Sequence, residues 1–249
     1  MKKRTKRYFR ILLFAAVLLL AIKWISGVRS SASRRTIDSN QPMVALTFDD
    51  GPCPGASDRI LDCLEANSAV ATFFEVGSNV EQYPEITKRA DALGCESGSH
   101  TYGHIDLSSA DEEVMKQDLA LCDKVFKSAM GRSPKIMRPP GGALSGTAKR
   151  YLDLPFFGWS LDTEDWRTRS AEATVQSVRN FGDLDGQVIL MHSIYDSSAD
   201  AACEIIPLLL EEGYQLVTVS ELLEYRYDRK PESHIYYTVD FFLYGADPN

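Results

Sequence analysis

The sequence predicts an α/β fold in which parallel strands, covered by helices, form a distorted (β/α)7 barrel. Short β-type runs alternate with helical patterns through most of the 249 residues, which is typical of parallel sheets. Polar motifs follow five of the expected strands at their carboxyl ends. We expect a barrel because it gathers these ends on one face, whereas an open sheet would spread them along a wide row.

The first 35 residues differ from the rest of the chain in charge. They hold ten of the 27 Lys and Arg residues and none of the 35 Asp and Glu residues. Basic residues before an apolar run place the start of a chain on the cytoplasmic side of a membrane. We therefore expect a basic cytoplasmic tail at residues 1–10 and a retained transmembrane helix at residues 11–28, about 27 Å long.

The expected anchor implies a single-pass protein of the cell membrane whose globular part is extracellular. A cleaved signal peptide, which would give a secreted protein, is the alternative. A linker (residues 29–41), one domain (residues 42–224) and an aromatic-rich C-terminal extension (residues 225–249) should follow. The acidic composition after residue 35 argues against a nucleic-acid partner, which would need a basic surface. We expect the domain to be a monomer.

The domain should contain seven strands and five helices. The expected strands are residues 43–48, 71–76, 95–99, 135–138, 156–161, 188–191 and 215–219. The expected helices are residues 57–66, 84–93, 111–130, 171–181 and 201–212. The third helix has the clearest pattern, because Met115, Leu119 and Phe126 recur at helical spacing and Ser109 with Glu112 fits a capping box.

The five cysteines show neither a pairing pattern nor a CxxC metal motif. Cys63, Cys122 and Cys203 lie among apolar residues of the expected helices, so we expect them to be buried free thiols. A disulfide between Cys53 and Cys63 is the alternative, because an exported domain would fold in an oxidising environment.

Two carboxylates and two imidazoles form the most informative pattern of the chain. Asp49 and Asp50 end the first expected strand, and His100 and His104 follow the third. Two imidazoles and one carboxylate can hold a divalent metal and leave a coordination position open, while the second carboxylate stays free as a base. The spacing alone does not decide which aspartate would do which. A simple Asp-rich turn is the alternative, and the histidine pair argues against it.

Three further motifs supply side chains that such a site could use. A guanidinium at Arg138 could keep one carboxylate of the aspartate pair ionised, and the N–H of Gly141 could donate to a negatively charged oxygen. A nearby carboxylate would raise the pKa of His192, so that its imidazole could act as an acid. Trp166 and Leu190 could form an apolar wall.

Taken in order, these motifs resemble those of the polysaccharide deacetylase family, also called the NodB-homology domain or carbohydrate esterase family 4. The motifs are residues 47–52, 99–104, 138–142, 162–166 and 190–192, and the resemblance covers about residues 41–223. It implies a distorted seven-stranded (β/α) barrel that binds zinc or a similar divalent metal, with cobalt, nickel and manganese as alternatives.

The resemblance also implies a role for each residue. Asp49 would be the base, oriented by Arg138, and His192 would be the acid, with its pKa tuned by Asp165. The implied metal ligands are Asp50, His100 and His104. The implied substrate contacts are Gly141, Trp166 and Leu190. Family members usually carry an aromatic residue where this chain has Gly141.

The function that we expect from the resemblance is removal of N-acetyl groups from a cell-surface polysaccharide, namely the N-acetylglucosamine residues of peptidoglycan. Deacetylation of chitin oligosaccharides or of acetylated xylan is the alternative within this class. A metal phosphoesterase would use similar side chains but more ligands. A non-catalytic, anchored carbohydrate-binding module is a third reading, which the complete set of Asp and His residues argues against.

Overall fold

The computed structural model describes residues 36–238 and 241–242, and its contacts divide the chain after Thr36 into two units. All of the helices and strands given below belong to the unit that begins at Ile37. The expected cytoplasmic tail, transmembrane helix and most of the linker lie outside the described residues. Within the described part, no helix is both long enough and apolar enough to span a bilayer.

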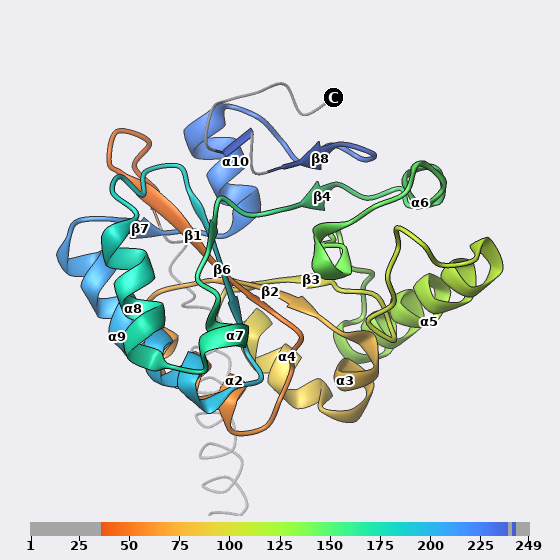
Figure 1. The fold of residues 1–249 in the computed structure, drawn as a ribbon, viewed down its shortest axis with the longest axis horizontal. Helices are drawn as coiled ribbons and strands as arrows, with labels where there is room; N and C mark the ends of the chain where they lie inside the picture. Colours follow the sequence, from red (N-terminus) through yellow and green to blue (C-terminus); the bar gives the residue numbers. More distant parts are fainter. Residues whose placement is uncertain (1–35, 239–240, 243–249) are drawn as a thin grey trace, which may run out of the picture. The chain divides into compact units, whose positions relative to one another are not determined.

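A parallel sheet forms the centre of an α/β fold (Figure 1). Its strands are β1 (Met43–Asp49), β2 (Thr72–Glu75), β3 (Glu96–Ser99), β5 (Leu161–Asp162), β6 (Val188–His192) and β7 (Gln215–Leu216). They lie in the order β3-β2-β1-β6-β5, with β7 paired to the start of β1. Strands β4 (Phe156–Phe157) and β8 (Tyr236–Tyr237) form a separate parallel pair. The prediction of an α/β fold with parallel strands is confirmed.

Two isolated bridges extend the pairing beyond the sheet. Met137 bridges Ser99 of β3 on one side and Phe156 of β4 on the other. Parallel pairings thus lead from β5 through β6, β1, β2 and β3 to Met137 and then to β4, which directly precedes β5 in the chain. The pairings therefore form a series whose two ends, β5 and β4, are adjacent in the chain.

The expected strand at residues 135–138 is reduced to the single bridging residue Met137. Pro134 and Pro139 flank it on either side. Because proline has no N–H, neither residue can donate to a neighbouring strand. The ladder therefore does not extend past the few residues between them.

Two other expected strands are shortened by a change of partner. The expected strand at residues 156–161 divides into β4 and β5, because Gly158 donates to the carbonyl of Tyr237 at 2.8 Å while Ser160 donates to that of Val188 at 2.9 Å. The expected strand at residues 215–219 ends early as β7. There Thr218 caps the next helix through a capping box, which ends the extended conformation.

Nine helices surround the sheet within the described residues. They are α2 (Ala56–Ala66), α3 (Gly77–Gln82), α4 (Pro84–Ala92), α5 (Glu112–Met130), α6 (Gly146–Tyr151), α7 (Asp165–Thr168), α8 (Ala171–Asn180), α9 (Asp196–Glu211) and α10 (Val219–Tyr227). The five expected helices correspond to α2, α4, α5, α8 and α9. Helices α2 and α8 pack on α9, and α3 and α4 pack on α5 (Figure 1).

The amino-terminal end of α5 differs from the expected capping box. The helix begins at Glu112 with Asp111 as its N-cap residue. The hydroxyl of Ser109 instead donates to the Oδ2 atom of Asp106 at 2.7 Å. The prediction was wrong because Asp106 organises its own turn just before the helix, which removes Ser109 from the capping position.

Strand β1 is buried on both faces, as expected of a strand in a parallel sheet covered on both sides. Val44, Leu46 and Phe48 pack into a cluster formed mainly with residues of α2 and α9. Met43 and Ala45 point the other way, into a second cluster that the strands and α10 enclose. Because side chains of a strand alternate, the last residue of β1, Asp49, belongs to the same face as Met43 and Ala45.

A disulfide joins Cys63 of α2 to Cys203 of α9, with their Cα atoms 5.4 Å apart. The expectation of free thiols at these two positions was therefore wrong, as was the alternative pairing of Cys53 with Cys63. The two cysteines are 140 residues apart in sequence. They meet because β1 and β6 are neighbours in the sheet, so the helices that follow them, α2 and α9, are neighbours as well.

Three of the described residues near the C-terminus are part of the packed core. Tyr237 of β8, Phe241 and Phe242 are all buried in the cluster that also contains Leu222 and Leu223 of α10. The expected boundary between domain and extension, at residue 224, falls inside α10.

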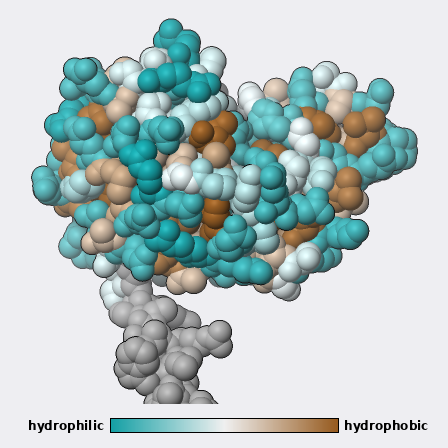
Figure 2. Space-filling model, turned by 90° about the horizontal axis from the view of Figure 1, so that it is seen from below, coloured by the Kyte–Doolittle hydropathy of each residue, from teal (hydrophilic) through white to brown (hydrophobic). Residues whose placement is uncertain are grey.

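The surface of the described residues is mostly hydrophilic when seen from below. Figure 2 shows hydrophobic residues only in separate small patches on this face. This distribution fits a net charge of -8 and a charged fraction of 25%.

Candidate active site

The two adjacent aspartates lie at the carboxyl end of β1, and the backbone separates their side chains. Asp49 is the last residue of the strand and is only 4% exposed. Asp50 follows it with a φ of 70°, a left-handed conformation that ends the strand. Asp49 also pairs in register with His192 at the end of β6. The sheet therefore brings the ends of two strands, 143 positions apart in sequence, side by side.

Arg138 lies in the interior with a fully buried side chain. Its Nη1 atom donates to the Oδ1 atom of Asp49 at 2.7 Å and to the Oγ1 atom of Thr47 at 2.8 Å. Its Nε and Nη2 atoms donate to the carbonyls of Phe157 (3.1 Å) and Gly158 (2.7 Å). A buried guanidinium needs such partners. In return it fixes the Oδ1 atom of Asp49.

Asp50, His100 and His104 form the one group of potential metal ligands among the described residues. One ligand atom from each side chain lies within 4.8 Å of the others. The Oδ1 atom of Asp50 is 3.5 Å from the Nε2 atom of His100 and 3.2 Å from that of His104. Two nitrogens and one oxygen at these distances suit a zinc-type ion with an open coordination position.

The hydrogen bonding of His100 leaves its Nε2 atom available for a metal. Its Nδ1 atom lies 2.7 Å from the carbonyl oxygen of Arg138. Because a carbonyl only accepts hydrogen bonds, the proton of the neutral ring sits on Nδ1 and the lone pair on Nε2. The same Arg138 therefore serves both parts of the site, through its side chain for Asp49 and through its backbone for His100.

The pKa values of His100 and Asp50 are shifted in the direction that metal binding needs, whereas the hydrogen bond to Asp50 raises the pKa of His104. Burial lowers the pKa of His100, which favours the neutral imidazole. Burial alone would raise the pKa of Asp50. However, the hydrogen bond from His104 and the charge of the nearby imidazoles outweigh it and hold the pKa of Asp50 below its usual value. The site thus offers an ionised carboxylate beside an uncharged imidazole.

The loop that carries the two histidines is held by a side chain that the motifs did not reveal. Asp118 of α5 accepts hydrogen bonds from the backbone N–H groups of Tyr102 and Gly103, both at 2.7 Å. The loop also contains Thr101 with a φ of 64° and His104 with a φ of 53°, which side-chain-bearing residues rarely adopt. Asp118 therefore stabilises a strained loop through its backbone N–H groups.

The sequence does contain a sign of this function of Asp118. Asp118 is three residues after Met115 and four before Cys122, so it lies on the apolar face of the helix. A carboxylate on a buried helix face needs a partner.

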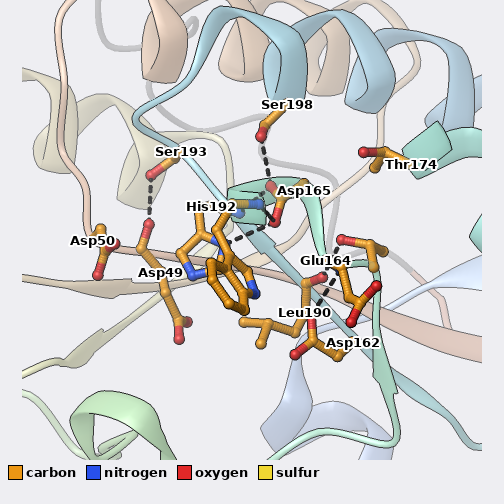
Figure 3. A network of polar contacts seen from close by, with 12 residues as sticks. Asp49, Asp50, Asp162, Glu164, Asp165, Thr174, Leu190, His192, Ser193 and Ser198 are labelled. Atoms are coloured by element: carbon orange, nitrogen blue, oxygen red, sulfur yellow. Dashed lines mark hydrogen bonds and ion pairs between the residues drawn. The ribbon is translucent and has the colours of Figure 1, made fainter. Parts of the chain in front are cut away.

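His192 is paired with Asp165, the first residue of α7. The Nδ1 atom of His192 lies 2.8 Å from the Oδ1 atom of Asp165, and the backbone N–H of His192 donates to the Oδ2 atom at 2.8 Å. Figure 3 shows the hydroxyl of Ser198 directed at the same carboxylate and the hydroxyl of Ser193 directed at the backbone of Asp49. Two contacts with His192 and one with Ser198 therefore fix the carboxylate of Asp165.

The pairing changes the proton affinity of His192. Burial alone would lower its pKa, but the hydrogen bond and charge of Asp165 outweigh burial, so that the pKa of His192 is raised. Its Nδ1 atom is engaged with Asp165, which leaves Nε2 to face the site. A protonated imidazole in this position can donate a proton.

The remaining candidate residues are Leu190, Trp166 and Gly141. Leu190 is buried on β6 and shares a strand face with His192, two residues later. Trp166 of α7 is 46% exposed, so its ring is open to a ligand. Gly141 lies in a short turn with a φ of 62° and is exposed. The contacts of the structure connect seven of the predicted residues, namely Asp49, Asp50, His100, His104, Arg138, Asp165 and His192. Thr47, Asp118 and Ser198 are additions, and the roles of Gly141, Trp166 and Leu190 stay predictions.

Comparisons with known proteins agree with these motifs. A family model described as polysaccharide deacetylase matches residues 36–154. Peptidoglycan-N-acetylmuramic acid deacetylase PdaC of Bacillus subtilis is 38% identical over 203 residues, which are 82% of this chain and 43% of that protein. A peptidoglycan-N-acetylglucosamine deacetylase of Bacillus cereus is 34% identical over 199 residues, covering 77% of this chain and 92% of that protein.

The solved structures show the same likeness. The structure of peptidoglycan deacetylase PdaC from Bacillus subtilis matches with a TM-score of 0.75 and 39% identity, covering 78% of this chain and 95% of that chain. The present chain spans less than half of the full length of PdaC, but it covers nearly all of the Bacillus cereus relative. Identity at this level over that length, together with the matching fold, shows that the chain belongs to the polysaccharide deacetylase family.

Proposed function

We propose that this protein is a metal-dependent hydrolase that removes N-acetyl groups from peptidoglycan. The observation that carries the proposal is the placement of an oriented carboxylate, Asp49, between a three-ligand cluster and the His192–Asp165 pair. Such a placement provides a base, a metal position and an acid around one reacting carbonyl. The names of the relatives, which are peptidoglycan deacetylases, support the choice of polymer.

The metal would be held by Asp50, His100 and His104. Zinc is the ion that two imidazoles and one carboxylate suit best, and cobalt, nickel or manganese would be tolerated by the same donors. When bound, such an ion polarises a carbonyl and lowers the pKa of water.

Asp49 acts as the base through its Oδ2 atom. Arg138 occupies the Oδ1 atom, while Oδ2 lies 3.8 Å from the Nε2 atom of the ligand His100. The free oxygen therefore faces the place where a water molecule would be held, and Arg138 holds the carboxylate in this orientation. Asp49 takes a proton from this water molecule while the oxygen of the water bonds to the acetyl carbon.

His192 completes the reaction as the acid. The bond between the acetyl carbon and the sugar nitrogen breaks, and His192 gives the proton on Nε2 to the departing nitrogen. The N–H of Gly141 donates to the carbonyl oxygen while that atom carries negative charge. Trp166 and Leu190 line the pocket for the acetyl methyl group. Acetate and a free amino sugar are the products, so water is the only co-reactant.

The finer description of the fold is a distorted barrel that is interrupted where β4 and β5 change partners. The series of parallel pairings that leads from β5 through the sheet and Met137 to β4 supports this description. We further propose that residues 11–28 anchor the protein in the cell membrane, with the catalytic domain outside and monomeric. The disulfide between Cys63 and Cys203 supports an extracellular location, because disulfides persist in oxidising environments.

Release of acetate from purified protein tests the proposal. The metal-stripped enzyme should be inactive on acetylated peptidoglycan fragments and should recover with zinc. Asp49→Asn should lower kcat by at least about 100-fold, because the base is lost, while zinc still binds in a calorimeter. Undiminished turnover by Asp49→Asn would refute the assignment. Release of acetate from acetylated xylan but not from peptidoglycan would shift the substrate to that alternative.

A further inference from the structure

A cation stands beside the proposed active site without a carboxylate partner. Arg169 follows α7 directly, and no ion pair joins it to any carboxylate within residues 36–238 and 241–242. Its neighbour Arg167, by contrast, pairs with Glu164. Among the described residues, the charge of Arg169 is therefore not neutralised by a neighbouring carboxylate.

The side chain of Arg169 is held in place by two contacts. Its Nε atom donates to the carbonyl of Trp166 at 2.7 Å. Its guanidinium carbon lies 3.3 Å from the centre of the Tyr195 ring, so the ring supports one face. Stacking of this kind leaves the edge of the guanidinium, with its N–H groups, free to donate. The group is therefore oriented before any ligand arrives.

Tyr195 connects this cation to the proposed acid. The centre of its ring is 6.1 Å from that of His192. Burial raises the pKa of Tyr195, and the charges of Asp50 and Asp165 add to this effect. Arg169 thus stands one aromatic ring away from the imidazole that gives its proton to the sugar nitrogen.

The combination of side chains at this rim suits a sugar that carries an acid. Trp166 exposes 46% of its surface for contact with the face of a sugar, and its carbonyl holds Arg169 next to it. A guanidinium edge recognises a planar carboxylate through two parallel hydrogen bonds. Only the ring of Tyr195 separates Arg169 from His192. A substrate group that reaches Arg169 therefore lies near the reacting acetamide rather than in a remote part of the polymer.

We infer that Arg169, supported by Tyr195, binds a carboxylate of the substrate, so that the enzyme prefers N-acetylated sugars bearing an acid near the acetamide over neutral ones. This inference rests on the proposed deacetylase function and narrows its substrate class. In peptidoglycan the carboxylate has two sources. One is the lactyl group of the N-acetylmuramic acid residue itself, and the other is the peptide that is attached to it.

The test compares Arg169→Gln with Arg167→Gln, a variant that removes the same charge two residues earlier, within α7. Three substrates are used: a neutral N-acetylglucosamine oligomer, peptide-free glycan strands with free lactyl carboxylates, and strands that carry peptides. Arg169→Gln should reduce the ratio of kcat/KM for acidic over neutral substrate by about tenfold, mainly through KM. Arg167→Gln should leave this ratio unchanged.

The arms of the experiment identify the source of the carboxylate. A larger loss on peptide-free strands assigns the lactyl group, and a larger loss on peptide-bearing strands assigns the peptide. Arg169→Lys keeps the charge but not the planar pair of donors, so it should recover only part of the ratio. An equal loss on neutral and acidic substrates, or none on either, would overturn the inference and leave a structural role for Arg169.

A binding measurement separates this inference from the proposed function. Calorimetric affinities of the unmodified protein and of Arg169→Gln for the same three ligands do not require turnover. If no substrate releases acetate, the deacetylase proposal fails. A preference for acidic ligands that Arg169→Gln abolishes would even then support the carboxylate site, and the absence of such a preference would refute it.

Discussion

Asp49 and Asp50 show how one step of the backbone can give two identical side chains different chemical environments. Asp49 ends a regular strand, so its carboxylate enters the interior and meets Arg138 at 2.7 Å. Asp50 has a φ of 70°, so its carboxylate turns toward the histidines. Neither environment is a property of aspartate itself. Each follows from the place where β1 ends.

The pairing of Asp165 with His192 should set the alkaline limit of activity. Because the pKa of His192 is raised by this pairing, the acid stays protonated to a higher pH. Asp165→Asn removes the charge, so the alkaline limb of the profile of kcat/KM against pH should move to lower pH. The rate should also fall by about 100-fold.

The same shift predicts how stability depends on pH. A raised pKa in the folded state gives a stabilisation that is complete below the pKa of the unfolded chain, about 6.5, and is lost as the pH rises through the folded value. Asp165→Asn should therefore lose more stability near pH 6 than near pH 8. Asp162→Asn serves as the control, and an unmoved alkaline limb in Asp165→Asn would contradict the role of the pair.

Asp118 should govern metal affinity although it is not a ligand. Asp118→Asn keeps the shape of the side chain, but its amide nitrogen cannot accept a hydrogen bond from Tyr102 or Gly103. The strained loop should relax, and calorimetry should show zinc binding weakened by about tenfold. Asp123→Asn, on the same helix but paired with Lys127, should bind zinc normally. Equal affinities for the two variants would contradict a positioning role.

Elements far apart in the chain are neighbours because the sheet orders them. The register of β1 with β6 places α2 beside α9, and the disulfide between Cys63 and Cys203 then links these helices. The same register aligns Asp49 with His192. The covalent link and the alignment of Asp49 with His192 are thus two results of one strand pairing.

The disulfide should contribute strongly to stability, since it closes a loop across 140 residues. Replacing both Cys63 and Cys203 by serine should lower the free energy of unfolding by about 4 kcal/mol, mainly because the unfolded chain gains freedom. Urea denaturation measures the change, and Cys53→Ser is the matched control. If reduction of the unmodified protein leaves its urea midpoint unchanged, the link has no such effect.

The elements that could be predicted from sequence are those with a local pattern. The polar residues at strand ends and the apolar repeat of α5 are visible within short windows of sequence. The partner of Cys63 and the reduced strand around Met137 depend on contacts between distant segments. Local patterns contain no information about such contacts, and for this reason the disulfide was missed and the strand at residues 135–138 was overestimated.

At the scale of the whole molecule, the C-terminal segment supports the proposed active site. The carbonyl of Tyr237 in β8 accepts a hydrogen bond from Gly158 at 2.8 Å. The carbonyl of Gly158 in turn accepts one from Arg138 at 2.7 Å, and Arg138 orients Asp49. A short series of contacts therefore leads from the last described strand to the proposed base. The described part of the C-terminal segment therefore belongs to the fold.

This connection predicts that a change at Tyr237 affects both stability and catalysis. Its ring is fully buried and stacks on Phe157 with 5.1 Å between the ring centres. Tyr237→Ala should lower the free energy of unfolding by about 4 kcal/mol. It should also lower kcat under conditions where the variant remains folded, because loss of the ring loosens β8, whose backbone carbonyl at residue 237 holds Gly158 and, through it, Arg138. Tyr237→Phe keeps the ring and loses only the hydroxyl, which donates to the carbonyl of Lys230 and accepts from the N–H of Glu232, so it should cost about 1 kcal/mol and leave kcat unchanged. Urea denaturation and acetate release measure the two effects separately. A Tyr237→Ala variant that is destabilised but fully active would show that β8 stabilises the fold without positioning Arg138.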